Sequence, residues 1–205
     1  MTVKSTENIN YTYDAAGNIE RDNSRNIIYT YDALNHLTIV TTSLGEEISF
    51  KYNGLSQRIV KTIGKNKTWY IYNSRGQLLE EIDKANNKTR DYIYADDGKL
   101  VAMLEKSNIY YIHTDHLNAP LLVTDANKNI VWKTSYNPFG RATIEVEQIK
   151  LNLRAAGQYA DEETGLYYNW NRYYNPELGR YITSDPLGLQ AGVNTYIRLF
   201  SMKNL

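Results

Sequence analysis

The chain has 205 residues, with 23 Lys plus Arg and 23 Asp plus Glu, so its formal net charge is zero. A neutral chain has no global electrostatic attraction to nucleic acid or to an anionic membrane. It contains no cysteine, which excludes a disulfide framework and a thiolate metal site.

The N-terminal residues 1–10 are polar and lack the apolar stretch of a secretory signal peptide. No segment approaches the ~18 apolar residues that a membrane-spanning helix needs. We therefore expect a soluble chain, or one whose targeting information lies in a segment outside this sequence. The sequence leaves the localisation open.

Tyrosine dominates the aromatic composition, with 19 Tyr against 3 Phe and 3 Trp. The tyrosines mark a repeat, because five units start with an aromatic-x-aromatic triplet. These units begin at Tyr11, Tyr29, Phe50, Tyr70 and Tyr92, so the steps between them are 18, 21, 20 and 22 residues. Self-similarity at a fixed period of this length is typical of repeat architectures.

Each unit predicts a strand, a turn and a second strand. The two aromatic residues of the triplet lie on one face of a strand, since strand side chains alternate between faces. The Asp or Asn that follows can bond to its own backbone, and Gly or Asn then supplies a positive φ, as at Gly17, Asn35 and Gly54. The unit is therefore a β-hairpin.

A single hairpin is only marginally stable, so the units must bury their aromatic faces together. We expect one continuous ladder of packed rings. Its members are Tyr13, Tyr31, Tyr52, Tyr72 and Tyr94.

The strand pattern continues less regularly as far as residue 140. Residues 141–157 give a mixed signal, in which Ile144, Val146, Ile149 and Leu151 fit either a strand or a short helix.

The period and the Tyr-x-Tyr-Asp-x-x-Gly motif resemble the YD repeats of Rhs and toxin-complex C proteins, and of teneurin-like YD shells. The second half is similar to the Rhs repeat-associated core domain. The resemblance covers about residues 11–197, and its motifs are 113–120, 136–140, 157–169, 172–176 and 179–189.

The resemblance implies that the repeats wind as a spiralling sheet into a hollow shell around a C-terminal toxin. It also implies that the core domain closes one end of the shell. In the family this domain frees the toxin by self-proteolysis with two aspartates, one from each of two Asp-Pro motifs. A full-length protein of this kind would be secreted or at the cell surface.

By this resemblance, Asp185 matches the aspartate of the first motif, and Arg180 matches an arginine that the family places near it. The second Asp-Pro motif would fall just past Leu205 and is missing, and residues 198–205 depart from the family pattern. An aspartic protease needs two carboxylates that share a proton. We therefore expect half a site, an inactive one, in a chain that is a truncated remnant without its toxin, and no enzymatic activity.

Two clusters, at residues 113–116 and 161–163, contain residue types that bind metals or act in acid–base catalysis. His113 and Asp115 share one strand face while His116 lies on the other, which disfavours a metal site. Asp161, Glu162 and Glu163 are expected to form a solvated turn, salt-bridged to Arg154 or Arg172, rather than an acid–base pair. We expect no metal and no cofactor.

The sequence thus predicts an all-β fold of stacked antiparallel β-hairpins in a curved, spiralling, open sheet. Residues 1–140 form the repeats, 141–197 the core-like segment, and 198–205 a frayed tail. Expected partners are the rest of an Rhs shell, a toxin domain or a second copy through the open sheet edges, but no nucleic acid. The leading function is a structural encapsulation module. The alternatives are a self-cleaving aspartic core domain and a carbohydrate or cell-surface binding protein that uses exposed Tyr, Trp69, Trp132 or Trp170.

Overall fold

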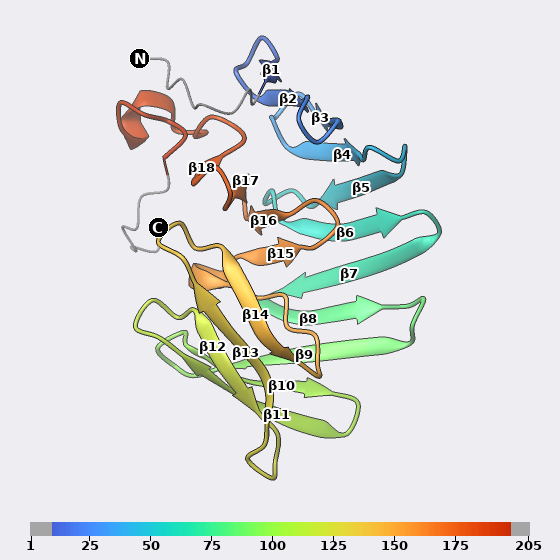
Figure 1. The fold of residues 1–205 in the computed structure, drawn as a ribbon, viewed down its shortest axis with the longest axis vertical. Helices are drawn as coiled ribbons and strands as arrows, with labels where there is room; N and C mark the ends of the chain where they lie inside the picture. Colours follow the sequence, from blue (N-terminus) through green and yellow to red (C-terminus); the bar gives the residue numbers. More distant parts are fainter. Residues whose placement is uncertain (1–9, 198–205) are drawn as a thin grey trace.

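The computed structural model describes residues 10–197, which fold into two antiparallel sheets (Figure 1). The larger sheet has 14 strands in strict sequence order, so each strand pairs with the next one in the chain. Its strands are β1 (Tyr11–Tyr13), β2 (Ile19–Asp22), β3 (Ile27–Tyr31), β4 (Leu37–Thr41), β5 (Glu47–Tyr52), β6 (Arg58–Ile63), β7 (Asn66–Tyr72), β8 (Leu78–Asp83), β9 (Lys88–Tyr94), β10 (Leu100–Glu105), β11 (Asn108–Thr114), β12 (Pro120–Thr124), β13 (Ile130–Tyr136) and β14 (Ala142–Glu147). The smaller sheet contains β15 (Tyr159–Asp161), β16 (Leu166–Asn169), β17 (Arg172–Asn175) and β18 (Arg180–Tyr181). Two short 3-10 helices are η1 (Ala155–Gly157) and η2 (Gly188–Ala191).

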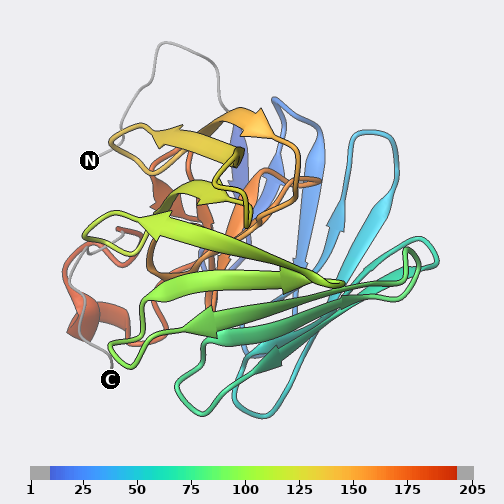
Figure 2. The same ribbon diagram turned by 90° about the horizontal axis from the view of Figure 1, so that it is seen from below.

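The large sheet is a series of hairpins that curves strongly, as the view from below shows (Figure 2). Within residues 10–197, β1 and β14 each pair with one neighbour only, so the sheet is open. The prediction of an all-β fold built from stacked antiparallel hairpins in a curved, open sheet is confirmed. Unpaired edge strands can pair with another chain, and self-association through β1 or β14 stays a prediction.

The turn after the aromatic triplet repeats one hydrogen-bond pattern. In the first repeat, Oδ1 of Asp14 accepts bonds of 2.9 and 2.8 Å from two amides of the turn, and Gly17 has a φ of 85°. Asn35 has the equivalent φ of 62° in the second repeat. In the third repeat the positive φ falls on Ser56, at 61°, and not on Gly54 as expected. The turn geometry requires a left-handed residue three positions after the Asp or Asn, whichever residue stands there.

The two aromatic residues of each triplet have different roles on the inner face of the large sheet. The first is buried in the core, as in Tyr29, Phe50, Tyr70 and Tyr92. The second is half-buried. Its hydroxyl donates to the backbone carbonyl of the first residue in the second strand of the preceding hairpin, which we call the return strand. These bonds join Tyr31 to Ile19, Tyr52 to Leu37, Tyr72 to Arg58, Tyr94 to Leu78 and Tyr136 to Pro120, with oxygen–oxygen distances of 2.7, 2.6, 2.9, 2.9 and 2.9 Å.

The expected ladder therefore forms with four of its five members, Tyr31, Tyr52, Tyr72 and Tyr94, all packed against the core. Tyr13 departs from it because its side chain is 47% exposed. β1 is an edge strand, and among the described residues no earlier return strand offers it a carbonyl.

The small sheet lies within the curve of the large one (Figures 1 and 2). One hydrophobic core joins the two sheets, with Tyr29 and Trp132 from the large sheet and Tyr159 and Tyr173 from the small sheet among its members. The other face of the small sheet has its own buried cluster of Ala160, Tyr167, Tyr174 and Tyr181. The small sheet thus packs on the concave side of the large sheet and buries side chains on both of its own faces.

The segment whose structure the sequence left open begins as a strand. β14 continues the large sheet, and residues 148–153 then run irregularly to η1 and the small sheet. The prediction of a frayed tail at 198–205 lies outside the described residues. Between residues 10 and 197, no helix has the length and apolar character to cross a membrane.

Candidate functional site

A buried ion pair joins the two sheets. Arg58 is the first residue of β6, and Asp161 is the last residue of β15. The Arg58 guanidinium donates from Nη1 to Oδ2 of Asp161, and neither side chain has exposed surface. The same Nη1 lies 3.2 Å from the hydroxyl oxygen of Tyr173. A buried charge is tolerated only when it is paired and hydrogen-bonded, so this contact fixes how the sheets sit together.

Aromatic rings surround the guanidinium of Arg58. Its Cζ lies 4.6–5.8 Å from five ring centroids: Phe50, Tyr70, Tyr159, Tyr168 and Tyr173 at 5.2, 4.7, 5.1, 4.6 and 5.8 Å. Two of these rings belong to the large sheet and three to the small sheet. The electron-rich ring faces attract the cation, most strongly where water is excluded. Arg58 therefore occupies the centre of the contact between the sheets.

Lys61 adds a second cation on the same strand. Its Nζ lies 3.1 Å from Oδ1 of Asp161 and 3.0 Å from Oε1 of Glu163. Burial alone would lower the pKa of Lys61, but the attraction of Asp161, Tyr70 and Glu163 outweighs it and raises the pKa. Because the pKa values of Arg58 and Lys61 are both raised, both cations stay charged at neutral pH, and the Asp161 carboxylate lies between them.

The expectation for the acidic turn is wrong in part. Glu162 is exposed and pairs with Lys150 at 2.7 Å. Asp161 is instead buried and pairs with Arg58 and Lys61, and neither Arg154 nor Arg172 is its partner. Asp161 looks solvated in sequence because its partners Arg58 and Lys61 lie 103 and 100 residues earlier in the chain, whereas the partner of Glu162 is only 12 residues away.

Arg58 and Lys61 were missed by the sequence reading, although the repeat contains a signal for one of them. In each repeat, the residue five positions after the first residue of the turn begins the return strand. It carries an apolar residue at Ile19, Leu37, Leu78 and Leu100, all of them buried. The third repeat has Arg58 there. A charge at a repeat position that is otherwise apolar indicates a buried partner elsewhere.

Asp185 lies in the turn that follows β18. Its Oδ2 is 2.6 Å from Nη2 of Arg172, and its Oδ1 accepts the amide of Leu187 at 2.9 Å. The guanidinium of Arg172 also lies 3.7 Å from the ring centroid of Tyr181. The cation next to the candidate aspartate is therefore Arg172, the first residue of β17.

Arg180, the other candidate residue, makes different contacts. Its guanidinium lies 4.4 Å from the ring centroid of Tyr196, and its Nε donates to the carbonyl of Tyr181 at 3.3 Å. Asp185 and Arg180 therefore lie in the same terminal region of the small sheet, but each has its own partner.

His113 and His36 have ordinary hydrogen-bond or ring partners. His113 Nε2 lies 3.2 Å from Oγ1 of Thr124, and Oδ1 of Asp115 accepts two amides of its own turn. His36 stacks on Tyr52 with 4.7 Å between ring centroids. Among residues 10–197, no group of three or more His, Asp or Glu side chains has the arrangement of a metal site. The expectation of no metal and no cofactor stays a prediction.

Aromatic side chains also close over turn glycines at the periphery of the sheets. A Cβ placed on Gly76 would lie 1.8 Å from the Trp170 ring, and one on Gly179 would lie 2.7 Å from the Phe139 ring. Indole Nε1 of Trp170 donates to the carbonyl of Leu55 at 3.0 Å. Each contact joins a turn of one sheet to a turn of the other.

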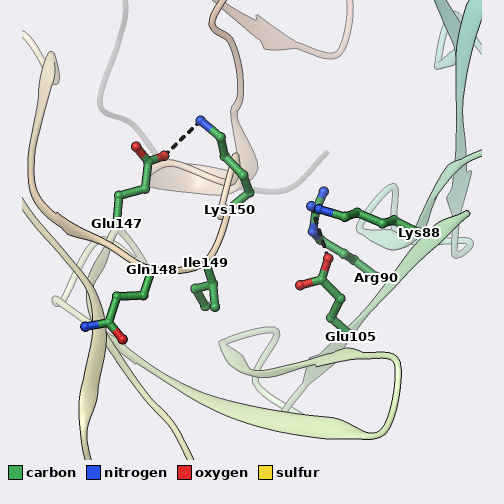
Figure 3. Close-up of a pocket in the computed structure, with 7 residues that line it drawn as sticks. All are labelled: Lys88, Arg90, Glu105, Glu147, Gln148, Ile149 and Lys150. Atoms are coloured by element: carbon green, nitrogen blue, oxygen red, sulfur yellow. Dashed lines mark hydrogen bonds and ion pairs between the residues drawn. The ribbon is translucent and has the colours of Figure 1, made fainter. Parts of the chain in front are cut away.

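A small polar hollow of about 230 Å³ lies between β9, β10 and the segment after β14 (Figure 3). Both signs of charge line it. Arg90 lies 3.2 Å from Glu105, and Lys150 lies 2.9 Å from Glu147. Because four of the five charged residues that line it are matched in these pairs, we assign no ligand to this hollow.

The model of the teneurin YD-shell family matches residues 2–201 of the chain. The chain is 34% identical over 193 residues to the tRNA3(Ser)-specific nuclease WapA of Bacillus spizizenii, a match that covers 91% of this chain and 8% of that protein. It is 41% identical over 99 residues to the toxin protein Tse5 of Pseudomonas aeruginosa, covering 48% of this chain and 8% of that protein.

Among solved structures, the chain is similar to the crystal structure of TcdB2-TccC3-Cdc42, with a TM-score of 0.77 at 19% identity, covering 92% of this chain and 10% of that one. This likeness shows that the fold is shared. The chain spans about a tenth or less of the length of these relatives. The family match over almost all of the sequence places the chain: it is a YD-shell module and belongs to the teneurin YD-shell family.

Proposed function

We propose that this module is a non-catalytic structural part of a toxin-enclosing Rhs/YD shell, in which it closes one end of the shell. The observation that supports this most directly is the small sheet packed inside the curve of the large one. A cage of rings around Arg58 and the buried Asp161 hold that sheet in place. Such a packed end blocks the passage of a polypeptide.

The size of the relatives supports a role as one portion of a longer wall. The chain covers 8% of WapA and 8% of Tse5, which are named as a nuclease and a toxin. Among residues 10–197, β1 pairs only with β2, so its other edge offers the hydrogen-bonding groups that a further hairpin would need. We infer that further repeats pair with β1 and extend the wall, and that the toxin is the partner it encloses.

The self-cleaving alternative is less well supported. In this chain one oxygen of the Asp185 carboxylate lies 2.6 Å from Nη2 of Arg172, and the other accepts the amide of Leu187, so both oxygens have partners that are not carboxylates. A proton-sharing dyad instead needs a second carboxylate beside the first. The proposed role is therefore structural.

A chimera tests the proposal. The segment of Bacillus spizizenii WapA that matches this chain is replaced by the chain, and trypsin digestion of the C-terminal nuclease segment is followed over time. We expect that segment to be digested as slowly as in parental WapA. A matched chimera with Asp161→Ala, which leaves Arg58 and Lys61 without their shared anion, should be digested faster. If the first chimera is digested as fast as the isolated nuclease segment, the closing role is wrong.

A further inference from the structure

The outward face of strands β7, β8 and β9 has an apolar character that the first strands lack. In the first two repeats the outward residue in the middle of the aromatic triplet is Thr12 or Thr30. In the fourth and fifth repeats it is Ile71 or Ile93, which are 44% and 39% exposed. Grouped apolar side chains on the surface of a soluble protein commonly mark a contact with another surface.

Trp69 belongs to the same face. Tyr70, its neighbour on β7, is buried on the inner face, and side chains alternate along a strand, so the indole points outward. Trp69 pairs with Ile82 of β8 in the sheet register and is 38% exposed. Trp69 and Ile82 therefore form an apolar row across two adjacent strands.

Lysines border this row on one side. The hairpin tips β6–β7 and β8–β9 stand side by side at one rim of the large sheet (Figure 1), and they carry the exposed residues Lys65, Lys67 and Lys84. Among the described residues, none of these lysines has a carboxylate partner. A local positive charge therefore persists in a chain whose total charge is zero.

Carboxylates border the row on its other side. Glu80 of β8 pairs with Ile71 in the sheet register, and Asp91 of β9 pairs with Glu80. Within residues 10–197, neither carboxylate forms an ion pair. Unpaired charges of opposite sign thus flank the row of Trp69 and Ile82.

The two sets of charges are placed symmetrically about Trp69. Lys67 precedes Trp69 by two residues and Ile71 follows it by two, so the rows of Lys67 and Ile71 each lie about 7 Å from the row of Trp69. A two-fold axis that crosses the strands at Trp69 reverses their direction, and it therefore exchanges the lysine row with the row of Glu80 and Asp91. The face is complementary in charge to a second copy of itself, as an isologous interface requires.

A hollow beside the lysines offers space to the second copy. It has a volume of about 520 Å³ and is lined by Lys65, Asn66, Lys67, Trp69, Lys84 and Ala85. The same rotation brings Ile71 of the second copy over this hollow, where the lysine stems and the indole cover it. The outward face lies on the convex side of the sheet (Figure 2), so the contact is limited to a few strands.

We propose that two copies of the chain associate through the outward face of β7, β8 and β9, with Trp69 at the two-fold axis. Lys67 and Lys84 of each copy then face the row of Glu80 in the other. A surface of one charge sign would match only half of these charges. The small contact predicts a dimer that forms only at high protein concentration. The inference goes beyond the shell function and does not depend on it, and the interface contains no residue of the edge strands β1 and β14.

Sedimentation velocity of the full chain over a wide range of concentrations tests the interface. We expect a reversible equilibrium of monomer and dimer, in which the dimer weakens with added salt. Trp69→Ala should raise the dissociation constant by about tenfold or more, as for a central aromatic residue of an interface. Tyr111→Ala removes another outward ring, 45% exposed, away from the axis and should leave the equilibrium unchanged.

An exchange of charges identifies the residues in contact. The lysine variant carries Glu80→Lys with Asp91→Lys, and the glutamate variant carries Lys67→Glu with Lys84→Glu. Each variant alone brings like charges together in the dimer and should stay monomeric. Their equimolar mixture should restore a dimer, because opposite charges again face each other.

A control variant accounts for net charge. Glu46→Lys with Glu47→Lys changes two exposed residues outside the proposed interface and gives the same net charge as the lysine variant. Alone it should dimerise as the parent does. Its mixture with the glutamate variant should form no mixed dimer, although the two net charges are opposite. Circular dichroism should show that all variants are folded.

A parent chain that is monomeric at every concentration would overturn the proposal and leave this face to a different partner. The proposal is also overturned if the lysine variant dimerises like the parent, as the pairing of edge strands would give. The same holds if the exchange mixture stays monomeric, or if the control mixture associates as well as the exchange mixture.

Discussion

The guanidinium of Arg58 and the carboxylate of Asp161 form an ion pair that joins the two sheets with no solvent-exposed side-chain surface on either partner. Removing one partner of a buried pair leaves an uncompensated charge, which costs much more than the pair itself contributes. The pair therefore determines the arrangement of the sheets more than it adds to their stability.

Arg58→Met should destabilise the protein by about 3–5 kcal/mol, because it strands Asp161 and empties the space between the rings. Urea unfolding followed by circular dichroism measures this. Arg75→Met, at an exposed turn, is the control and should stay within about 0.5 kcal/mol of the parent. The double variant Arg58→Met with Asp161→Leu should recover part of the loss, since no buried carboxylate is left without Arg58 and Lys61 keeps its ion pair with Glu163. A parent-like stability of Arg58→Met alone would show that the pair has no such role.

The hydrogen bonds from tyrosine hydroxyls to the preceding hairpin should contribute to stability independently of the ion pair between Arg58 and Asp161. Tyr72→Phe removes the 2.9 Å bond to the carbonyl of Arg58 and leaves that acceptor unpaired, so we expect a loss of about 1 kcal/mol. Tyr94→Phe removes the equivalent bond to Leu78 and should behave alike. Tyr111→Phe, on the exposed outward face, should have no measurable effect. Equal stabilities for all three variants in urea unfolding would contradict a role for these bonds.

The repeats were predictable because a local pattern determines them. Alternating side chains, a turn residue and a left-handed residue at a fixed distance specify each hairpin, whether Gly17, Asn35 or Ser56 occupies the last position. The packing of the small sheet was not predictable in the same way. Tyr167 and Tyr168 are both buried, on opposite faces of β16, so no apolar alternation shows which face meets the large sheet.

The candidate site shows the same limit. Nothing near Asp161 in sequence indicates that Arg58 and Lys61 surround it, because these contacts arise only when residues a hundred positions apart meet. The resemblance to a family identified Asp185, but the pairing of Asp185 with Arg172 depends on how β17 and the following turn pack.

A comparison of Gly76 with Gly45 separates the free-energy cost of displacing the Trp170 ring from the cost of backbone strain. Gly76 and Gly45 have nearly the same φ, 76° and 77°, but a Cβ on Gly45 would meet nothing within 4 Å. Gly45→Ala should therefore cost about 1 kcal/mol, from the left-handed backbone alone. Gly76→Ala should cost about 2–3 kcal/mol, because the Trp170 ring must also move. Thermal unfolding compares the two, and equal losses would show that Trp170 yields without cost.

Alkaline pH should unfold the protein through its tyrosines. Burial raises the pKa of Tyr29, Tyr70 and Tyr168 to about 12, whereas an unfolded tyrosine loses its proton near pH ~10. The unfolded state therefore loses these protons first. The contribution of these tyrosines to the free energy of unfolding should be fully present below pH ~10. Between pH ~10 and pH ~12 it should fall by about 1.4 kcal/mol per pH unit for each such tyrosine.

The ultraviolet absorbance of tyrosinate, followed together with circular dichroism, measures this. We expect a late group of tyrosines to ionise together with unfolding. Tyr70→Phe should reduce the slope of the free energy of unfolding against pH by the contribution of one tyrosine, about 1.4 kcal/mol per pH unit. Ionisation of all tyrosines in one gradual step near pH ~10, with the fold intact, would contradict the burial of these hydroxyls.

The Asp185 turn should be stable and chemically inert. The intact mass of the purified chain should not change during prolonged incubation at acidic or neutral pH, because Asp185 pairs with Arg172 at 2.6 Å and a single carboxylate cannot share a proton with itself. Asp185→Asn should lower the stability by about 1–2 kcal/mol through loss of a charge-assisted hydrogen bond. Arg172→Gln should do the same, and the double variant should lose less than the sum. A fragment ending near Leu189 in the parent, absent from Asp185→Asn, would instead assign self-cleavage to this turn.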